Sequence, residues 1–163
     1  SYCNSPAGML NPDVLGKNRD TGMYYSDPYE YDGGMRSPSM SAALYPSLKT
    51  HMIEHHWLQQ ARADCNPSFS GGTYDGCEPF YFNAAFESAP VSLFYDGHIE
   101  LLGTREATRA DARVQQQSGH GLWSRDTPFG GEGYYSDIAY DWTTTSFHIL
   151  TIDGIRGRDK TGG

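Results

Sequence analysis

The chain has 163 residues with a formal net charge of −8, and 20% of its residues are charged and 13% aromatic. No apolar run approaches the roughly 18 residues of a membrane-spanning helix, and an acidic chain without a sizeable lysine and arginine cluster is a poor nucleic-acid binder. Its aromatic content is too high for a disordered chain, so we expect a single globular domain over residues 1–163.

The first 36 residues are rich in turn-forming pairs. Asn11-Pro12, Asp27-Pro28 and Gly33-Gly34 all favour turns, and tyrosines lie between them. We therefore expect residues 1–36 to form an irregular N-terminal segment that is tied down by aromatic rings.

Pro46 begins the segment that we expect to be the main helix. Proline suits the first helical position, because the amide hydrogen that it lacks would have no intrahelical partner there. The apolar residues that would form one broad face are Leu48, Met52, Ile53, Trp57 and Leu58. The sequence therefore predicts a helix over residues 46–61.

His51, Glu54 and His55 in this segment match the H-x-x-E-H pattern of some zinc peptidases. On a helix the two imidazoles would lie one turn apart on one face, where they could hold Zn²⁺ with the carboxylate near a bound water. The chain offers no matching second motif for a further ligand. The simpler interpretation is an amphipathic helix whose polar side carries these three residues.

The chain has three cysteines, and Cys65 and Cys77 bracket a loop dense in Gly, Ser, Asn and Pro. A disulfide across this loop would remove conformational entropy worth about 3 kcal/mol in the chain-entropy model. We predict this Cys65–Cys77 disulfide, which implies a compartment outside the cytosol. Cys3 is then either free or paired with another chain.

Residues 91–102 carry the clearest local signal. Asp96-Gly97 tolerates the positive φ angles of a two-residue type I′ turn, and it lies between an apolar run at 91–95 and an alternating run at 98–102. We therefore predict a hairpin over residues 91–102.

Two further elements are predicted in the C-terminal part. Residues 104–117 form a polar segment with regularly spaced alanines and indicate a short solvent-facing helix that ends at Ser118-Gly119. Residues 145–152 are β-prone, and Asp153-Gly154 follows them, so we predict a second hairpin over residues 145–158. The expected fold is a loop-rich α+β class in which an antiparallel sheet with two Asp-Gly hairpins packs on the main helix.

Acidic residues in glycine-rich loops provide candidate calcium ligands. The candidates are Asp126, Asp137 and Asp141, with Asp153 and Asp159 nearby in the sequence. Ca²⁺ takes roughly 6–8 oxygen ligands, and loop-rich extracellular domains use it as a staple. No EF-hand spacing occurs, so the alternative is that these residues form turns and solvate the surface.

The string VSLFYDGHIELL at residues 91–102 resembles the C-terminal signature of the prepilin-like H-X9-DG proteins that are abundant in planctomycetes. The tail SFHILTIDGIRGRD is similar to tails of such proteins, so the resemblance covers about residues 83–160. Phe86 stands where the motif has its histidine, and a prepilin's hydrophobic helix would have to precede residue 1. The resemblance implies a pilin- or pseudopilin-like head with an antiparallel sheet on a helix, no catalysis and often a loop calcium.

We therefore expect a non-enzymatic extracytoplasmic domain, in the periplasm, at the cell surface or secreted, that acts in assembly or adhesion. Its partners would be other copies or related subunits of a filament or surface assembly, and no nucleic acid. No cofactor is established, although Ca²⁺ and Zn²⁺ are both possible. The alternatives are a metal-dependent hydrolase that uses His51, Glu54 and His55, and a carbohydrate-binding module that uses exposed tyrosine and tryptophan rings.

Overall fold

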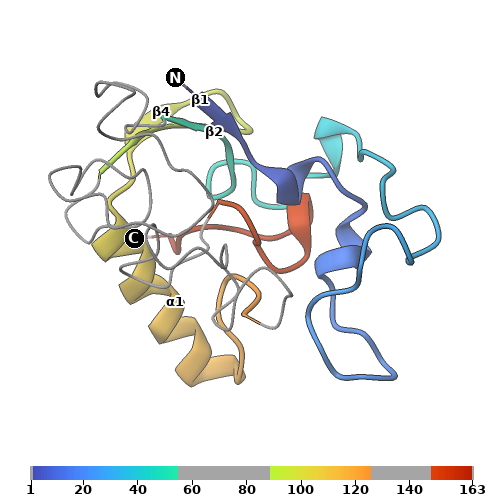
Figure 1. Ribbon diagram of the computed structural model, residues 1–163. Coiled ribbons are helices and arrows are strands. Elements are labelled where there is room, and N and C mark those ends of the chain that lie inside the picture. Colours follow the sequence, from blue (N-terminus) through green and yellow to red (C-terminus); the bar gives the residue numbers. More distant parts are fainter. Residues whose placement is uncertain (1, 55–88, 126–147, 163) are drawn as a thin grey trace, which may run out of the picture.

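A computed structural model describes residues 2–54, 89–125 and 148–162 (Figure 1). Its regular elements are β1 (Tyr2–Asn4), β2 (Thr50–Glu54), β3 (Val91–Phe94), β4 (Ile99–Leu101) and α1 (Thr104–Ser118). Short 3-10 helices lie at Pro6–Gly8, Pro12–Leu15, Met40–Ala42 and Gly154–Arg156. A helix together with an antiparallel sheet places the described part of the chain in the α+β class.

The four strands form a sheet in the order β1-β2-β3-β4, and every neighbouring pair is antiparallel. Along β3, Ser92 and Phe94 are buried while Val91 and Leu93 are half-buried, so the two faces of the sheet alternate. The register shifts between Thr50 and Met52, which is a β-bulge at His51. Because of this bulge, Thr50 and Ile53 can both be buried although they are three residues apart.

The helix predicted over residues 46–61 is wrong for the part that the structure describes. Residues 50–54 form strand β2, and Lys49 N–H closes a turn by donating to the carbonyl of Tyr45 over 3.0 Å. The backbone of β2 pairs with strands on both sides, and this pairing outweighs the local helical periodicity. Residues 55–61 lie outside the described part of the chain.

The segment 91–102 folds back on itself, with β3 and β4 in antiparallel register from Val91 opposite Leu101 to Leu93 opposite Ile99. The connection is not the two-residue type I′ turn that we predicted, because Asp96 does not have a positive φ angle. The amide of Gly97 donates to the carbonyl of Phe94 over 3.0 Å, and Gly97 itself has φ 90°. This is a three-residue loop in which glycine occupies the left-handed position.

The second hairpin, predicted over residues 145–158, is wrong in residues 148–158. Thr151 forms only an isolated antiparallel bridge with Trp123, and Gly154–Arg156 is a 3-10 helix. His148 and Asp153 have φ angles of 71° and 63°, which no continuous strand permits. Residues 145–147 lie outside the described residues.

Helix α1 confirms the prediction for residues 104–117 and extends it by one residue. Gly119 ends it in the left-handed conformation with φ 81°, and its amide donates to the carbonyl of Gln115 over 2.9 Å. Ala107, Ala110 and Val114 are its buried apolar residues. No helix of the described residues combines the length and apolar character that a membrane span requires.

The core joins residues from all parts of the described chain. Its buried members are Ala7, Val14, Leu15, Ile53, Phe94, Leu102, Ala107, Ala110, Val114, Leu122, Trp123, Ile149 and Leu150. Among the described aromatic residues, Phe94 and Trp123 are fully buried, whereas Tyr2, Tyr29 and Tyr45 are exposed. Aliphatic side chains and alanines therefore fill more of this core than the composition predicts.

Candidate functional site

The structure does not place the H-x-x-E-H residues on a helix. His51 lies at the bulge of β2 and its ring centroid is 4.8 Å from that of Tyr95, while Glu54 ends the strand. Three residues of extended chain span about 10 Å, against about 5–6 Å between neighbours on a helix face. The spacing that suggested a zinc site is therefore absent from residues 51–54, and His55 lies outside the described residues.

The other residues predicted from sequence lie mostly beyond the described ranges. These are the calcium candidates Asp126, Asp137 and Asp141 and the disulfide pair Cys65 and Cys77. Cys3 lies on β1, opposite Ile53 of β2. Within residues 2–54, 89–125 and 148–162, no group of three His, Cys, Asp or Glu residues is arranged to hold a metal ion.

An ion pair that the sequence did not predict lies at the centre of the fold. Lys49 Nζ lies 2.8 Å from Asp159 Oδ2, and both side chains are 0% exposed. Oδ2 of Asp159 also accepts from the amide and the hydroxyl of Thr50, over 3.0 and 2.5 Å. Its other oxygen, Oδ1, accepts from the amide of His148 and the hydroxyl of Thr151. The carboxylate therefore has five donors.

These donors determine the charge state of Asp159. Burial alone would raise the pKa of this carboxyl, but the charges of Lys49 and His148 and the hydrogen bonds hold it at about 2. Burial in turn lowers the pKa of Lys49, and the adjacent carboxylate opposes that shift. Asp159 is therefore an ionised carboxylate at neutral pH.

The hydrogen bonds around this pair close into a network. Thr50 Oγ1 gives its one hydrogen to Asp159, so the ring nitrogen Nδ1 of His148, 2.6 Å away, must be the donor to Thr50. Lys49 Nζ also donates to Ser5 Oγ over 3.0 Å, and Ser5 Oγ donates to the backbone carbonyl of His148. The network joins the N-terminal segment, β2 and the C-terminal segment, and all its side chains are buried.

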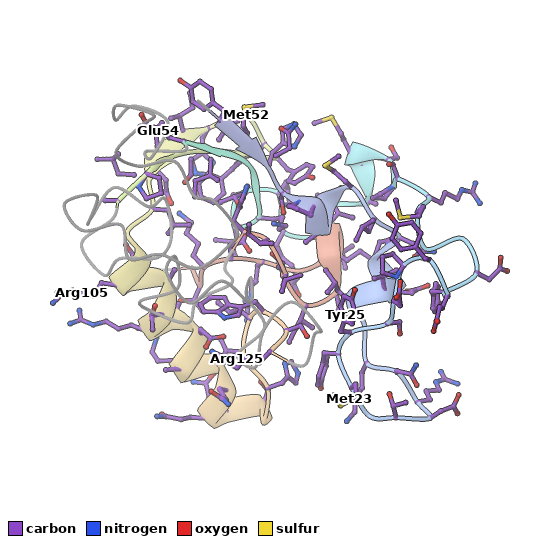
Figure 2. All side chains as sticks on the ribbon, viewed as in Figure 1. Met23, Tyr25, Met52, Glu54, Arg105 and Arg125 are labelled. Atoms are coloured by element: carbon purple, nitrogen blue, oxygen red, sulfur yellow. The ribbon has the colours of Figure 1, made fainter. Side chains whose placement is uncertain are left out.

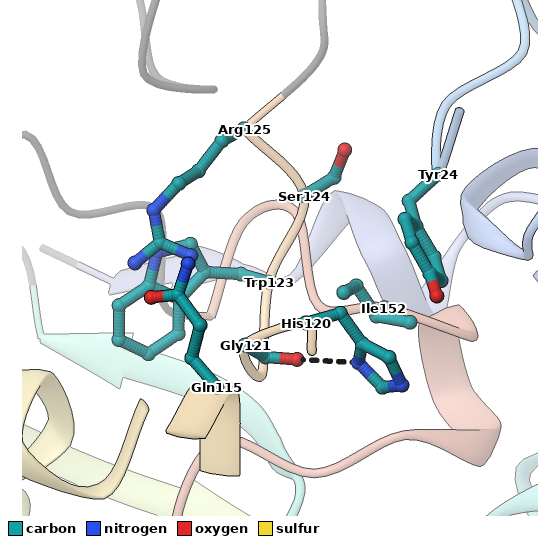
Figure 3. Close-up of a pocket in the computed structure, with 8 residues that line it drawn as sticks. All are labelled: Tyr24, Gln115, His120, Gly121, Trp123, Ser124, Arg125 and Ile152. Atoms are coloured by element: carbon teal, nitrogen blue, oxygen red, sulfur yellow. Dashed lines mark hydrogen bonds between the residues drawn. The ribbon is translucent and has the colours of Figure 1, made fainter. Parts of the chain in front are cut away.

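A pocket of about 230 Å³ lies at the C-terminal end of α1 (Figure 3). Tyr24 and His120 lie on one side of it, and Gln115, Trp123 and Arg125 lie on the other. The ring centroids of Tyr24 and His120 are 5.0 Å apart. The pocket is thus bounded by the rings of Tyr24 and His120 on one side, and by the ring of Trp123 and the polar side chains of Gln115 and Arg125 on the other.

Arg125 is held in place from two directions. Its guanidinium forms an ion pair with the buried carboxylate of Asp111 and lies 5.5 Å from the ring centroid of Trp123. Asp111 also accepts from the amide of Leu122 over 2.6 Å. At Gly121 a Cβ atom would lie 2.0 Å from Asp111 Oδ1, so the backbone can approach this carboxylate only because residue 121 is glycine. The guanidinium is therefore preorganised beside the pocket.

The sheet exposes apolar side chains on the face that points away from Phe94, which we call the outer sheet face. It consists of Met52, Val91, Leu93, Ile99 and Leu101. Ile99 and Leu101 are 66% and 65% exposed, and both belong to the edge strand β4. Such an edge is a ready template for pairing with another chain.

The sequence contained no local signal for either the ion pair or the pocket. Lys49 and Asp159 are 110 residues apart, and Tyr24 reaches the pocket from the N-terminal segment. The edge strand, by contrast, was part of the predicted hairpin. Comparison of the chain with protein-family models, curated proteins and solved structures finds no match, so its function has to be argued from its own residues.

Proposed function

We propose that this protein is a non-enzymatic structural domain of pilin- or pseudopilin-like type that associates with further copies of itself through the β4 edge. The observation that carries the proposal is the exposure of Ile99 and Leu101, at 66% and 65%, on the last strand of the sheet that the described residues form. Isolated exposed apolar residues are common, but two on one edge strand beside further apolar residues form a patch that favours association.

Within residues 2–54, 89–125 and 148–162, β4 pairs with β3 alone, so its other edge faces away from the sheet. The amide of Phe94 donates to the carbonyl of His98 over 3.0 Å, and the amide of Leu102 donates to the carbonyl of Pro90 over 3.2 Å. Residues 98 and 102 therefore turn their polar groups toward β3. Because these groups alternate along an antiparallel strand, Ile99 and Leu101 turn theirs away from the sheet.

Two β4 strands from two copies can pair in antiparallel orientation about a two-fold axis at Glu100. In this pairing the outward-facing backbone groups of Ile99 and Leu101 all form hydrogen bonds. The pairing places Ile99 of one copy opposite Leu101 of the other, so that each pair can exchange two backbone hydrogen bonds. Both side chains lie on the outer sheet face, and the apolar stripe would continue from one copy into the next. The edge is therefore complementary to itself.

The charges at this edge are compatible with the pairing. Two copies of Glu100 would face each other across the axis, but in each copy Glu100 forms an ion pair with Lys160. Lys160 Nζ also lies 4.8 Å from the ring centroid of Phe94, on the inner face of the sheet. Each acidic side chain thus brings its own counter-charge, and the repulsion is offset.

The association is expected to be weak. Each large apolar side chain contributes about 1.5–3 kcal/mol when it is fully buried. Four such side chains meet in the pairing, which is comparable with the cost of association, about 4–15 kcal/mol. Detectable dimers should therefore require a high protein concentration, as in a surface assembly where copies are held close together.

Sedimentation velocity over a concentration series tests the proposal. We expect the wild type to shift toward twice the monomer mass as concentration rises, and the variant Ile99→Lys/Leu101→Lys to remain monomeric. Leu44→Lys is the matched control, because Leu44 is 66% exposed but lies outside the sheet. A wild type that stays monomeric throughout, or a control that dissociates as the edge variant does, would contradict the proposal.

The extracytoplasmic location is a separate part of the proposal. It is supported by the resemblance of residues 91–102 to prepilin-like proteins and by the disulfide predicted between Cys65 and Cys77. Alkylation and mass spectrometry of protein from its native source should show those two thiols protected. Free thiols at both positions would contradict the extracytoplasmic location. They would not affect the proposed β4 pairing, which sedimentation velocity tests separately.

A further inference from the structure

The pocket beside α1 lies far from the proposed assembly edge. Figure 1 shows the sheet at one end of α1 and the segment 120–125 at the other. Figure 2 agrees, because the labelled Met52 and Glu54 lie at one end of the view and Arg125 and Met23 at the other. A ligand in this pocket would therefore leave the β4 edge free, and the two proposals can be tested separately.

The dimensions of the pocket limit its ligand. A volume of about 230 Å³ is smaller than the roughly 300–1,000 Å³ of pockets that hold drug-sized molecules. It suits one ring with its substituents. The rings of Tyr24 and His120, inclined at 42° to each other, and the side chain of Ile152 supply apolar contacts for such a ring.

The charge of the lining indicates an anion. Among the described residues that line the pocket, Arg125 carries a guanidinium and none carries a carboxylate, although the whole chain has a net charge of −8. Lys17 Nζ lies 5.9 Å from the ring centroid of Tyr24 and adds a second positive charge nearby. Asp111 pairs with the two terminal nitrogens of Arg125, which leaves the edge formed by Nε and one terminal nitrogen for a second carboxylate.

Neutral polar groups complete the lining. Nδ1 of His120 lies 3.1 Å from the carbonyl oxygen of Gly121 (Figure 3). A carbonyl oxygen only accepts, so Nδ1 is the donor, and in the neutral ring Nε2 is an acceptor for a ligand hydroxyl. The amide of Gln115 can both donate and accept. Ring contacts, hydroxyl partners and a guanidinium together match an acidic sugar.

We propose that this pocket binds a single sugar ring that carries a carboxylate, such as a terminal hexuronic acid of an acidic glycan. The carboxylate pairs with Arg125, hydroxyl groups pair with His120 and Gln115, and the ring lies against Tyr24. A ligand of this size is expected to bind with a Kd on the order of 1 mM, which suits a surface domain that contacts many such sugars at once.

Titration of ¹⁵N-labelled protein with galacturonate, galactose and acetate tests this by amide chemical shifts. We expect galacturonate to give saturable shifts around residues 119–125, and galactose to bind at least tenfold more weakly. Equal affinity for galactose would overturn the proposal, as would acetate reproducing the galacturonate shifts at the same concentrations. The absence of saturable shifts with galacturonate would also overturn it.

A charge variant tests the pocket without disturbing the core. Gln115 is exposed on α1, so Gln115→Glu should fold normally, and it places a carboxylate beside the pocket. We expect at least a tenfold loss of galacturonate affinity, because the introduced carboxylate repels the carboxylate of the ligand. The matched control is Gln116→Glu, one position along the same exposed helix surface but outside the pocket. Equal galacturonate affinity in the two variants would overturn the proposal.

Discussion

Replacing Asp159 with asparagine should lower the free energy of unfolding by about 3–5 kcal/mol, because it leaves Lys49 as a buried unpaired cation. The variant keeps the size of the side chain but exchanges one oxygen for an amide nitrogen. Each carboxylate oxygen of Asp159 already accepts from at least two donors, so the nitrogen meets donors at either position. The loss would be a large fraction of the roughly 5–15 kcal/mol that stabilises a typical domain.

Equilibrium unfolding in urea, followed by circular dichroism, measures this loss. Asp13→Asn is the control, because Asp13 and its partner Arg156 are 53% and 39% exposed, and breaking such a pair should cost less than about 1 kcal/mol. If Asp159→Asn does not fold, the double variant Lys49→Met/Asp159→Asn provides the test. We expect the double variant to be more stable than Asp159→Asn, since it removes the unpaired buried ammonium of Lys49. A loss below about 1 kcal/mol for Asp159→Asn, or strictly additive effects of the two substitutions, would refute the reasoning.

Three further predictions concern stability. The pKa of Asp159 is about 2 in the folded protein and near 3.8 in the unfolded chain. Its ionisation therefore adds about 2 kcal/mol to the free energy of unfolding above pH 4, and this stabilisation is lost as the pH falls toward 2. Urea unfolding between pH 6 and pH 2 should show this loss in the wild type, and Asp159→Asn should lack it. Gly97→Ala should cost about 1–2 kcal/mol, because residue 97 has φ 90°, and Gly162→Ala, whose glycine has open space around it, should change stability little. Leu15→Ala should lower the free energy of unfolding by about 2–5 kcal/mol, because Leu15 is buried in the core. The control is Leu44→Ala, at an exposed site. Equally small effects of the two variants would show that the N-terminal segment does not stabilise the fold.

Local sequence determined the elements whose physical cause lies within a few residues. The helix at 104–118 follows from its own residues and from Gly119, which supplies the left-handed conformation at its end. The fold-back of residues 91–102 also depends on a local property, since Gly97 adopts the positive φ angle that the loop requires. The type of turn differed from the prediction because only one of the two turn residues adopts a positive φ angle.

The failed predictions share a different cause. Residues 50–54 have a plausible helical pattern, but they pair with strands that lie more than 35 residues away on either side in the sequence. Residues 148–158 looked like a hairpin, but their polar groups turn inward to the network around Asp159. Long-range backbone pairing outweighs the local helical preference of residues 50–54. The buried ion pair outweighs the local β preference of residues 148–158.

The candidate sites could not be predicted for the same reason. Lys49 and Asp159 are 110 residues apart, and only the folded chain shows that both are buried and paired. The pocket joins Tyr24 to residues 115–125 and to Ile152, and none of these segments indicates the others. Composition and short-range patterns determined the class of fold, the helix at 104–118 and the alternating apolar pattern of residues 98–102. The tertiary structure alone decided which charges are buried together and which side chains line the pocket, because desolvation and pairing depend on contacts between distant segments.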